Sequence, residues 1–286
     1  MTGCLLSSRG VLEVAGDDAA TFLNAVSSCP VTRIEPGGAG FGALLTPQGK
    51  IVADFILFKQ AETLCFLDVS LSALPELVKR LTMYRLRAKI TVTDVSNLLA
   101  VFVGGETDAV PAAPDPRLAA LGLRGLAHVG QIAADSAAED AYHAGRVRNG
   151  VPEGGRDFLW NDVFPHEVMM DLLNGLDFTK GCYIGQEVVS RMQHKTVVRT
   201  RTFTIRCGSP APWTRGEPVM AGEKTIGTAG DGRNGEAVAL LRLDMLEAAH
   251  RGGIPVTLRA APVTLVLQPW IPFGVAYEPV IMGGTP

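Results

Sequence analysis

One cysteine, Cys182, stands in a polar, glycine-flanked stretch, FTKGCYIGQEVVSRM, at residues 178–192. The glycines on either side allow the backbone to turn tightly. A helix is predicted to begin just after the cysteine, with Glu187 in its first turn, where negative charge is favourable. A thiol ahead of a helix N-terminus and beside the charge of Lys180 has a lowered pKa. The stretch therefore predicts a reactive thiolate, and the alternative is a small apolar side chain that fills a turn.

The other cysteines give no sign of a disulfide or a metal site. They are widely spaced, bring the total to five, form no Cys-x-x-Cys pair and lie in or beside apolar stretches. We therefore expect no disulfide framework and no structural zinc site. Unpaired thiols fit the cytoplasm, which is the location that we expect. These cysteines are Cys4, Cys29, Cys65 and Cys207.

A cysteine–histidine hydrolase is an enzyme class that the sequence leaves open. Such an enzyme needs a histidine within hydrogen-bond reach of the Cys182 thiol. His194 follows about three turns along the same predicted helix, so it cannot reach back to the thiol. The other candidates are His128, His143, His166 and His250.

A run without acidic residues follows the cysteine. From Val188 to Arg206 there is no Asp or Glu, although the whole chain has a net charge of −3. A local basic edge suits an anionic ligand tail, whereas the overall charge gives no reason to expect nucleic acid. The alternative is a solvated helix and strand face. The basic residues of the run are Arg191, Lys195, Arg199, Arg201 and Arg206.

The length and composition indicate a globular protein. The chain has 286 residues, of which 47% are hydrophobic and 19% charged, and this is enough for two domains. No apolar run reaches the ~18 residues that are needed to cross a bilayer, and the first residues lack the basic and long apolar regions of a secretory signal. We therefore expect no association with membranes.

Hydrophobic periodicity and turn residues predict the elements that position these groups. Residues 10–28 predict a strand followed by a helix, and residues 40–60 predict a hairpin around a Pro-Gln-Gly turn. Residues 71–86 predict an amphipathic helix. Residues 139–150 predict a helix that ends at its Asn-Gly pair.

Two further segments differ from this pattern. Residues of about 104–136 are rich in Pro, Gly and Ala, and they predict a surface connection around a short, weak element. After residue 200, short strands alternate with Gly and Pro turns, which indicates a small β-barrel.

Several blocks of the sequence resemble one protein family. The octapeptide KGCYIGQE, at residues 180–187, resembles the signature of the YgfZ family, the bacterial branch of the folate-binding iron–sulfur cluster assembly proteins. RVRNGVPEGGRD at 146–157 and FPHEVMMDLLNGLDFTKGCYIGQEVVSR at 164–191 are especially similar to the mitochondrial branch. The resemblance covers nearly the whole chain outside about 104–136. The family shares its fold with the glycine-cleavage T-protein, an aminomethyltransferase that uses tetrahydrofolate.

The resemblance implies an α+β, GcvT-like three-part ring with interleaved N-terminal subdomains, one of them ferredoxin-like, and a C-terminal β-barrel. Residues 1–200 would form the folate-binding region, made of roughly 1–42 plus 137–200, with 43–136 inserted as the ferredoxin-like unit. Residues 201–286 would form the barrel.

The resemblance also implies site residues. Cys182 would be the functional thiol, and the other motif residues at the catalytic site would be Lys180, Tyr183, Gln186 and Glu187. The implied cofactor is tetrahydrofolate or a reduced folate derivative. Asp54 falls where the T-protein carries a pair of adjacent acids, whereas Arg148 replaces a T-protein Glu that could bind the pterin.

The remaining folate contacts are predicted from chemistry. Tyr142 could stack on an aromatic ring of the cofactor, and the alternative is a half-buried core tyrosine. Arginine guanidiniums pair well with the carboxylates of folate. The candidates are Arg9, Arg148, Arg191 and Arg199.

The resemblance implies a tetrahydrofolate-binding accessory factor for the assembly or repair of 4Fe–4S clusters in client enzymes. Its partners would be folate and iron–sulfur client enzymes or assembly proteins, and we expect a monomer. One cysteine cannot hold a cluster alone, because such clusters take four thiolates. One alternative is a tetrahydrofolate-dependent aminomethyltransferase or demethylase, so whether the protein is an enzyme stays open. Another is a pure interaction protein.

Overall fold

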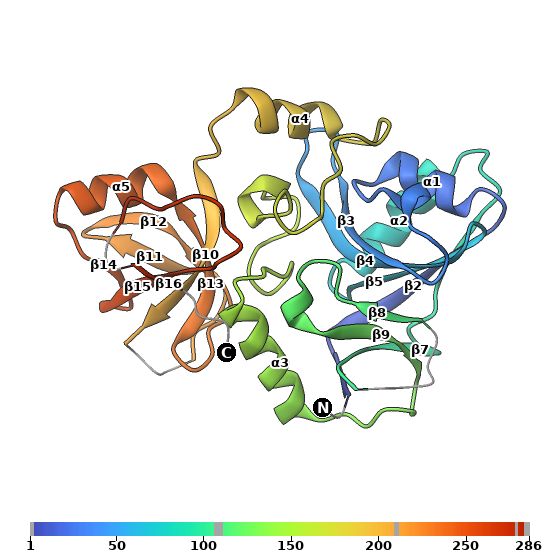
Figure 1. Ribbon diagram of the computed structural model, residues 1–286, viewed down its shortest axis with the longest axis horizontal. Coiled ribbons are helices and arrows are strands. Elements are labelled where there is room, and N and C mark those ends of the chain that lie inside the picture. The colour runs from blue at the N-terminus through green and yellow to red at the C-terminus, as the bar shows by residue number, and fades with distance from the viewer. Residues whose placement is uncertain (1–2, 106–110, 209–211, 278–279, 283–286) are drawn as a thin grey trace.

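The computed structural model describes residues 3–105, 111–208, 212–277 and 280–282. The chain forms two antiparallel sheets in its N-terminal part and a β-barrel in its C-terminal part, with helices between and around them (Figure 1). No helix in the described part of the chain is long and apolar enough to cross a membrane.

The first sheet has five antiparallel strands in the order β3-β4-β5-β2-β6. Its β3–β4 hairpin confirms the one predicted from the sequence, and Gly49 in the turn has a φ of +81°. Two helices cover one face, and Leu23 and Leu77 from them share a core with Leu12 and Leu67 of the sheet. The elements are β2 (Arg9–Ala15), α1 (Ala19–Val26), β3 (Ala39–Leu45), β4 (Ile51–Ala61), β5 (Leu64–Ser70), α2 (Leu74–Tyr84) and β6 (Thr91–Asp94).

A second sheet, in the order β1-β7-β9-β8, packs on the opposite face of the first. Because side chains alternate along a strand, Val11 points away from Leu12 and joins Val101 and Leu126 in the other core. The strands are β1 (Cys4–Leu5), β7 (Leu99–Val103), β8 (Ala112–Pro114) and β9 (Leu123–His128), and the 3-10 helices η1 (Val31–Arg33) and η2 (Ala119–Leu121) lie in nearby connections.

This topology corrects two expectations from the sequence. The segment of about 104–136 is more than a surface connection, because β9 pairs with β7 along five residues and is largely buried. Residues 43–136 are also not a separate inserted unit. The boundary at 43 falls inside β3, and β2, from the segment 1–42, pairs with β5 along all seven of its residues.

Two α-helices, α3 and α4, flank the centre of the molecule (Figure 1). α3 (Ser136–Arg148) begins where the Asp135 carboxylate accepts hydrogen bonds from two backbone N–H groups, and it ends at Asn149 and Gly150, as predicted. The short η3 (Pro165–Val168) leads toward the cysteine stretch, and α4 (Gln186–Lys195) follows that stretch. α4 and the linker after it run along the upper edge in Figure 1 between the two sides of the molecule.

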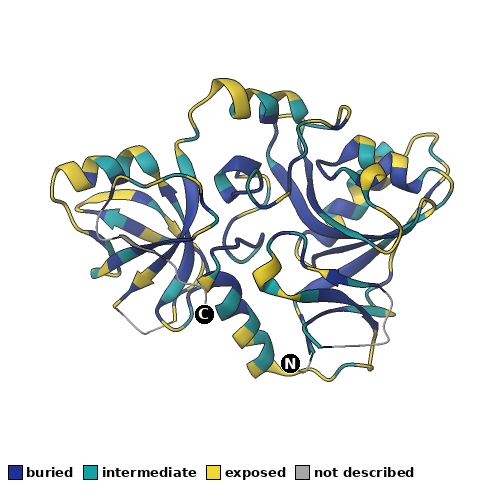
Figure 2. Cartoon of the chain, in the orientation of Figure 1, coloured by how far each residue is buried: buried dark blue, intermediate teal, exposed yellow. Residues whose placement is uncertain are grey.

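The C-terminal part confirms the predicted barrel. β10 pairs with both β13 and β15, so six strands close in the order β10-β13-β12-β11-β14-β15, and β16 adds to β15 in parallel. β10 is largely buried, whereas β12 and the helix α5, which the sequence did not predict, have exposed residues (Figure 2). The elements are β10 (Thr200–Cys207), β11 (Glu217–Ala221), β12 (Lys224–Ala229), β13 (Glu236–Arg242), α5 (Leu243–Arg251), β14 (Val256–Leu258), β15 (Ala261–Leu267) and β16 (Val280–Met282).

Candidate functional site

Lys180 anchors the motif loop, which we define as residues 177–185, to the end of α1. Its Nζ donates hydrogen bonds to the carbonyl oxygens of Asn24, Ser27 and Cys29, the last at 3.0 Å. These carbonyls lie at the C-terminal end of α1, where helix carbonyls lack partners and positive charge is favourable. Burial lowers the pKa of Lys180 to about 8, which leaves the ammonium charged at neutral pH. The structure therefore corrects the role expected for Lys180: it positions the loop.

Asp177 holds the first turn of the motif loop. Its Oδ1 accepts hydrogen bonds from the N–H groups of Thr179 at 2.6 Å and Lys180 at 2.8 Å. Although burial opposes it, these bonds lower the pKa of the Asp177 carboxyl. The Arg33 guanidinium donates to Asp177 at 2.8 Å and to the carbonyl of Thr179 at 2.9 Å. The backbone before the cysteine is thus held from two sides.

A glycine with a left-handed backbone ends the motif loop. Gly185 has a φ of +81°, and a Cβ there would lie 2.7 Å from the carbonyl oxygen of Thr46. Gly181 has no left-handed φ, and a Cβ at that position would meet no atom within 4 Å, so only one of the two flanking glycines is required. The Tyr183 N–H donates to Oε1 of Gln186 at 3.3 Å, which ties the turn to α4.

The Cys182 thiol is exposed on this anchored loop, which fits a reactive thiol better than a side chain that fills a turn. Burial raises the pKa of the Cys29 thiol to about 12 and that of the Cys65 thiol to about 11, so both stay protonated at neutral pH. Among the five thiols, Cys182 alone is accessible to a large partner. The four buried cysteines are Cys4, Cys29, Cys65 and Cys207.

Tyr183 and Glu187 have different surroundings from Cys182. The Tyr183 side chain is buried, its ring lies 4.9 Å from the Lys180 ammonium, and burial raises its pKa to about 12. Tyr183 therefore packs the loop against the protein. Glu187 is exposed on α4, where it pairs with Arg191 at 2.9 Å.

No described histidine is paired with Cys182 in the way that a cysteine hydrolase requires. His166 Nε2 lies 3.0 Å from Oε1 of Gln193, and burial lowers the pKa of His143 to about 3. His194 lies on α4, as expected. Within the described ranges, no hydrogen bond joins Cys182 to a histidine. This removes the geometric support for that enzyme class.

A buried ionic cluster lies between the two N-terminal sheets, and the sequence did not reveal it. The Asp68 carboxylate is fully buried and pairs with Arg9 at 2.6 Å and with Arg124 at 2.5 Å. Arg9 also donates to the Asp68 carbonyl at 2.8 Å. These contacts correct the prediction that Arg9 binds folate carboxylates, because its guanidinium is committed to Asp68. The one sequence signal was an acid inside the apolar strand LCFLDVS.

Tyr142 extends this cluster to α3. Its hydroxyl accepts hydrogen bonds from Arg124 at 2.7 Å and from Arg117 at 3.1 Å, and Arg117 pairs with the buried Asp115 at 2.6 Å. On the same helix, Arg146 pairs with the buried Asp157 at 2.5 Å. The hydroxyl of Tyr142 is thus fixed, while its ring lines a cavity of about 540 Å³ between α3, β1 and η2.

Asp54, on β4, is a buried carboxyl with little hydrogen bonding. It is 6% exposed, and the bond that its side chain accepts is a long one of 3.4 Å from the Gly154 N–H. Burial raises its pKa, although the nearby Arg9 opposes this. A carboxyl in this state has acceptor capacity left for a ligand.

The remaining arginines divide into exposed and paired ones. Arg148 and Arg199 are exposed, so they remain predicted contacts for an anionic ligand. Arg201 is buried and pairs with Asp171 at 2.6 Å, so it does not belong to a basic edge. Arg206 pairs with Glu236 at 2.7 Å.

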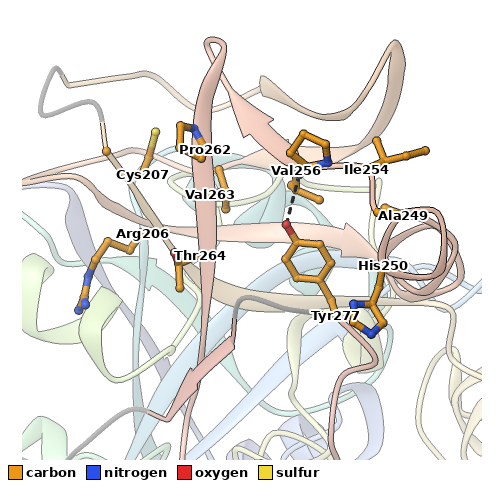
Figure 3. Close-up of a pocket in the computed structure, with 13 residues that line it drawn as sticks. Arg206, Cys207, Ala249, His250, Ile254, Val256, Pro262, Val263, Thr264 and Tyr277 are labelled. Atoms are coloured by element: carbon orange, nitrogen blue, oxygen red, sulfur yellow. Dashed lines mark hydrogen bonds between the residues drawn. The ribbon is translucent and has the colours of Figure 1, made fainter.

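A second cavity, of about 550 Å³, lies at the barrel (Figure 3). Cys207, His250 and Tyr277 line it, and the N–H of Val256 donates to the Tyr277 hydroxyl at 3.2 Å. The residues of the motif loop do not line this cavity.

Of the predicted folate contacts, Asp54 is the buried acceptor with hydrogen-bonding capacity left, which the N–H groups of a pterin ring would use. Asp54 does not line either of the two cavities described above. In the described residues, no group of three His, Cys, Asp or Glu side chains could hold a metal ion.

Two domain families match parts of the chain. The GCVT N-terminal domain matches residues 5–105, and the CAF17, C-terminal beta-barrel domain matches residues 199–273. The crystal structure of the glycine cleavage system aminomethyltransferase T from Bartonella henselae superposes with a TM-score of 0.63 at 14% identity, covering 92% of this chain and 84% of that one. The predicted GcvT-like α+β fold with a C-terminal barrel is thus confirmed.

Two curated relatives are named as mitochondrial proteins. Iron-sulfur cluster assembly factor IBA57, mitochondrial, from Homo sapiens is 32% identical over 270 residues, which are 82% of this chain and 76% of that protein. The IBA57 homolog from Mycosarcoma maydis is 31% identical over 231 residues, which are 71% of this chain but 57% of that protein. The chain therefore spans little more than half the length of the fungal relative.

These names bear on two expectations. The expected cytoplasmic location is contradicted, because both relatives are mitochondrial proteins by name. The expected similarity to the mitochondrial branch is confirmed by the same relatives. From the human match and the two domain families together, the chain belongs to the IBA57 family of iron–sulfur cluster assembly factors.

Proposed function

We propose that this protein is an accessory factor in the assembly or repair of 4Fe–4S clusters and that Cys182 is its functional thiol. The observation that carries the proposal is the exposure of Cys182 on a loop that the buried side chains of Lys180 and Tyr183 anchor. A packing cysteine would be buried, as the other four are.

The contacts of the motif loop hold the Cys182 thiol in a fixed position at the surface. Lys180 and Asp177 fix the backbone before the thiol, and Gly185 fixes the turn after it. Such support lowers the entropy that is lost when a partner binds the thiol. A single thiol supplies one of the four ligands that a cluster takes, so the other ligands would come from a partner. The partners are therefore iron–sulfur client enzymes or assembly proteins.

We further propose that a reduced folate is bound through Asp54. The carboxyl would accept hydrogen bonds from the pterin ring, and Tyr142 and Arg148 remain candidates for contacts with the rest of the molecule. When bound, a reduced folate supplies one-carbon or redox chemistry at the site. The support is the unsatisfied acceptor capacity of Asp54 and the GcvT-like fold.

Aminomethyl transfer remains the second candidate function, because the fold is that of an aminomethyltransferase. It would require the folate site but not the Cys182 thiol. The two functions are separated by Cys182→Ser and Asp54→Asn variants expressed in a strain that lacks the gene. If 4Fe–4S enzyme activity returns with the serine variant and fails only with Asp54→Asn, the folate site is the functional centre and the thiol is not.

A further inference from the structure

The outward side of α4 is almost free of packing against the rest of the protein. Of its ten residues, only Val189 is buried. The inward side is held by Val189 and by Gln193, whose Oε1 lies 3.0 Å from His166 Nε2. We define the α4 outer surface by the exposed side chains Glu187, Arg191, Lys195, Val197 and Arg199, the last two on the linker to the barrel. His194 is also exposed, but its ring lies edge-on against Phe178, with ring centroids 6.4 Å apart.

The α4 outer surface is basic in a protein that is acidic overall. The chain has a net charge of −3, yet Glu187 is the one acid of this surface and Arg191 already pairs with it. Lys195 and Arg199 have no ion pair with any described residue. Because Arg201 and Arg206 form ion pairs elsewhere, the positive charge of the run is concentrated at Lys195 and Arg199.

An exposed apolar residue, Val197, lies between Lys195 and Arg199 in the chain. Val197 is 80% exposed, far more than is usual for valine. A bare electrostatic site for a small anion has no need of it, whereas a surface that contacts a polypeptide combines charges with apolar area.

The α4 outer surface also lies next to the thiol in the chain. α4 begins four residues after Cys182 and is ten residues long, so it extends about 15 Å at a rise of 1.5 Å per residue. An extended segment of about five residues covers that length at about 3.3 Å per residue. A polypeptide bound along α4 would therefore bring its next residues close to Cys182.

We propose that the α4 outer surface docks an acidic segment of a partner protein and delivers that partner to the Cys182 thiol. The inference rests on the proposed function, because it names the chemistry of the partner of the same site. Charge complementarity of this kind raises the rate of encounter and selects partners more than it adds final affinity.

The test measures how fast Cys182 reacts with charged peptides. The probe is a peptide of one cysteine, activated as a 2-thiopyridyl disulfide, followed by about six glutamates, a length that reaches Lys195. The Cys182 thiolate attacks the peptide sulfur, a mixed disulfide forms, and the released pyridine-2-thione is measured by its absorbance. The reference peptide carries glutamines in place of the glutamates. The other four thiols are buried and do not compete.

The acidic peptide is expected to react about tenfold faster than the glutamine peptide at low salt. The ratio of the rate with the acidic peptide to the rate with the glutamine peptide should fall toward one at about 1 M salt, where the Debye length is about 3 Å. With the Lys195→Glu, Arg199→Glu variant, the two peptides should react at equal rates. The matched control is Lys224→Glu with Arg215→Glu, which makes the same charge change at exposed positions on the barrel and should keep the ratio.

Equal rates for the two peptides with the wild type would overturn the proposal, as would a ratio that survives in the Lys195→Glu, Arg199→Glu variant. If that variant does not fold, Lys195→Gln with Arg199→Gln should still reduce the ratio. If polyglutamyl but not monoglutamyl tetrahydrofolate blocks the reaction of the acidic peptide with Cys182, the α4 outer surface binds the polyglutamate tail of folate. The proposal then fails. The failure of the proposed function would appear elsewhere, as full rescue of cluster enzymes by Cys182→Ser.

Discussion

Lys180 and Cys182 are two residues apart, yet one is buried and the other is exposed. The Lys180 ammonium donates to three carbonyl oxygens at the end of α1, while the Cys182 thiol is open to solvent. The sequence motif suggested that the lysine acts on the thiol directly. The structure indicates that the lysine fixes the backbone from which the thiol projects.

Lys180→Met should destabilise the protein, because it leaves the three carbonyls at the end of α1 without their donor. The free energy of unfolding is expected to fall by about 2–3 kcal/mol, the scale for hydrogen bonds to a charged group. Urea unfolding measures this. Lys195→Met is the control on the exposed surface and should change stability by less than about 0.5 kcal/mol. A loss for Lys180→Met no larger than that of the control would contradict the anchoring role.

The burial of Lys180 has a pH signature of its own, because the cost of burying the ammonium disappears when it loses its proton. Its pKa is about 8 in the folded protein and about 10.4 in an unfolded chain, so the unfolded state binds more protons between these values. The contribution of Lys180 to stability should therefore rise with pH across this window and be constant below it. The difference in unfolding free energy between wild type and Lys180→Met, measured from about pH 7 to about pH 10.5, should show this slope.

The two glycines that flank Cys182 should respond differently to substitution. Gly185→Ala places a Cβ 2.7 Å from the Thr46 carbonyl oxygen at a φ of +81°, so it should cost about 1–3 kcal/mol and displace the loop. Gly181→Ala meets no atom within 4 Å and should be tolerated. Thermal unfolding and rescue of 4Fe–4S enzyme activity measure the two effects. Equal behaviour of the two variants would show that the turn geometry does not matter.

The buried Asp68 should be among the most sensitive positions. Asp68→Asn weakens its ion pairs with Arg9 and Arg124 in the protein interior. Breaking buried pairs of this kind costs about 3–5 kcal/mol, since a charge is left without its partner. Glu236→Gln removes an exposed pair with Arg206 and should cost less than about 1 kcal/mol. If chemical denaturation gives similar losses for both variants, the cluster does not support the sheets.

Asp54→Asn should increase stability while it removes folate binding. Because burial raises the pKa of Asp54, the folded state holds its proton more tightly than the unfolded state. Stability therefore falls as pH rises through the window between the two pKa values and stays lower above that window. Asn has no such cost, so the variant should be more stable than wild type above the window and show no gain below it, which urea unfolding at a series of pH values measures.

Calorimetry supplies the second half of this test. Wild type is expected to bind tetrahydrofolate with a micromolar Kd, about −8 kcal/mol, and Asp54→Asn is expected to show no heat. Binding that is unchanged in Asp54→Asn would place the cofactor elsewhere or exclude it.

Local patterns in the sequence predicted local structure well. The β3–β4 hairpin, the end of α3 at Asn149 and the barrel strands follow from alternation and turn residues, which act over a few neighbouring positions. α5 was missed because its apolar start, at Leu243, continues the strand β13 without a turn signal. The split at residue 43 was wrong because the pairing of β2 with β5 joins segments that are about fifty residues apart.

The candidate site was predictable only in part, for a related reason. The motif identified Cys182 as a candidate thiol, and the structure shows that it is exposed. Which charges are buried depends on contacts between distant segments, so Asp68 and Arg124 were missed and Arg9 and Arg201 were given ligand roles. Residue type and spacing do not distinguish an arginine that binds a ligand from one that pairs in a core.

The central claim is that the Cys182 thiol is required for the maturation of 4Fe–4S enzymes. The direct measurement is the activity of a 4Fe–4S enzyme in a strain that lacks the gene and expresses wild type, Cys182→Ser or Cys207→Ser at equal levels. Cys207 is the control because it is a buried thiol outside the motif loop. Wild type and Cys207→Ser should restore activity, and Cys182→Ser should fold but fail to restore it. Full restoration by Cys182→Ser would contradict the account.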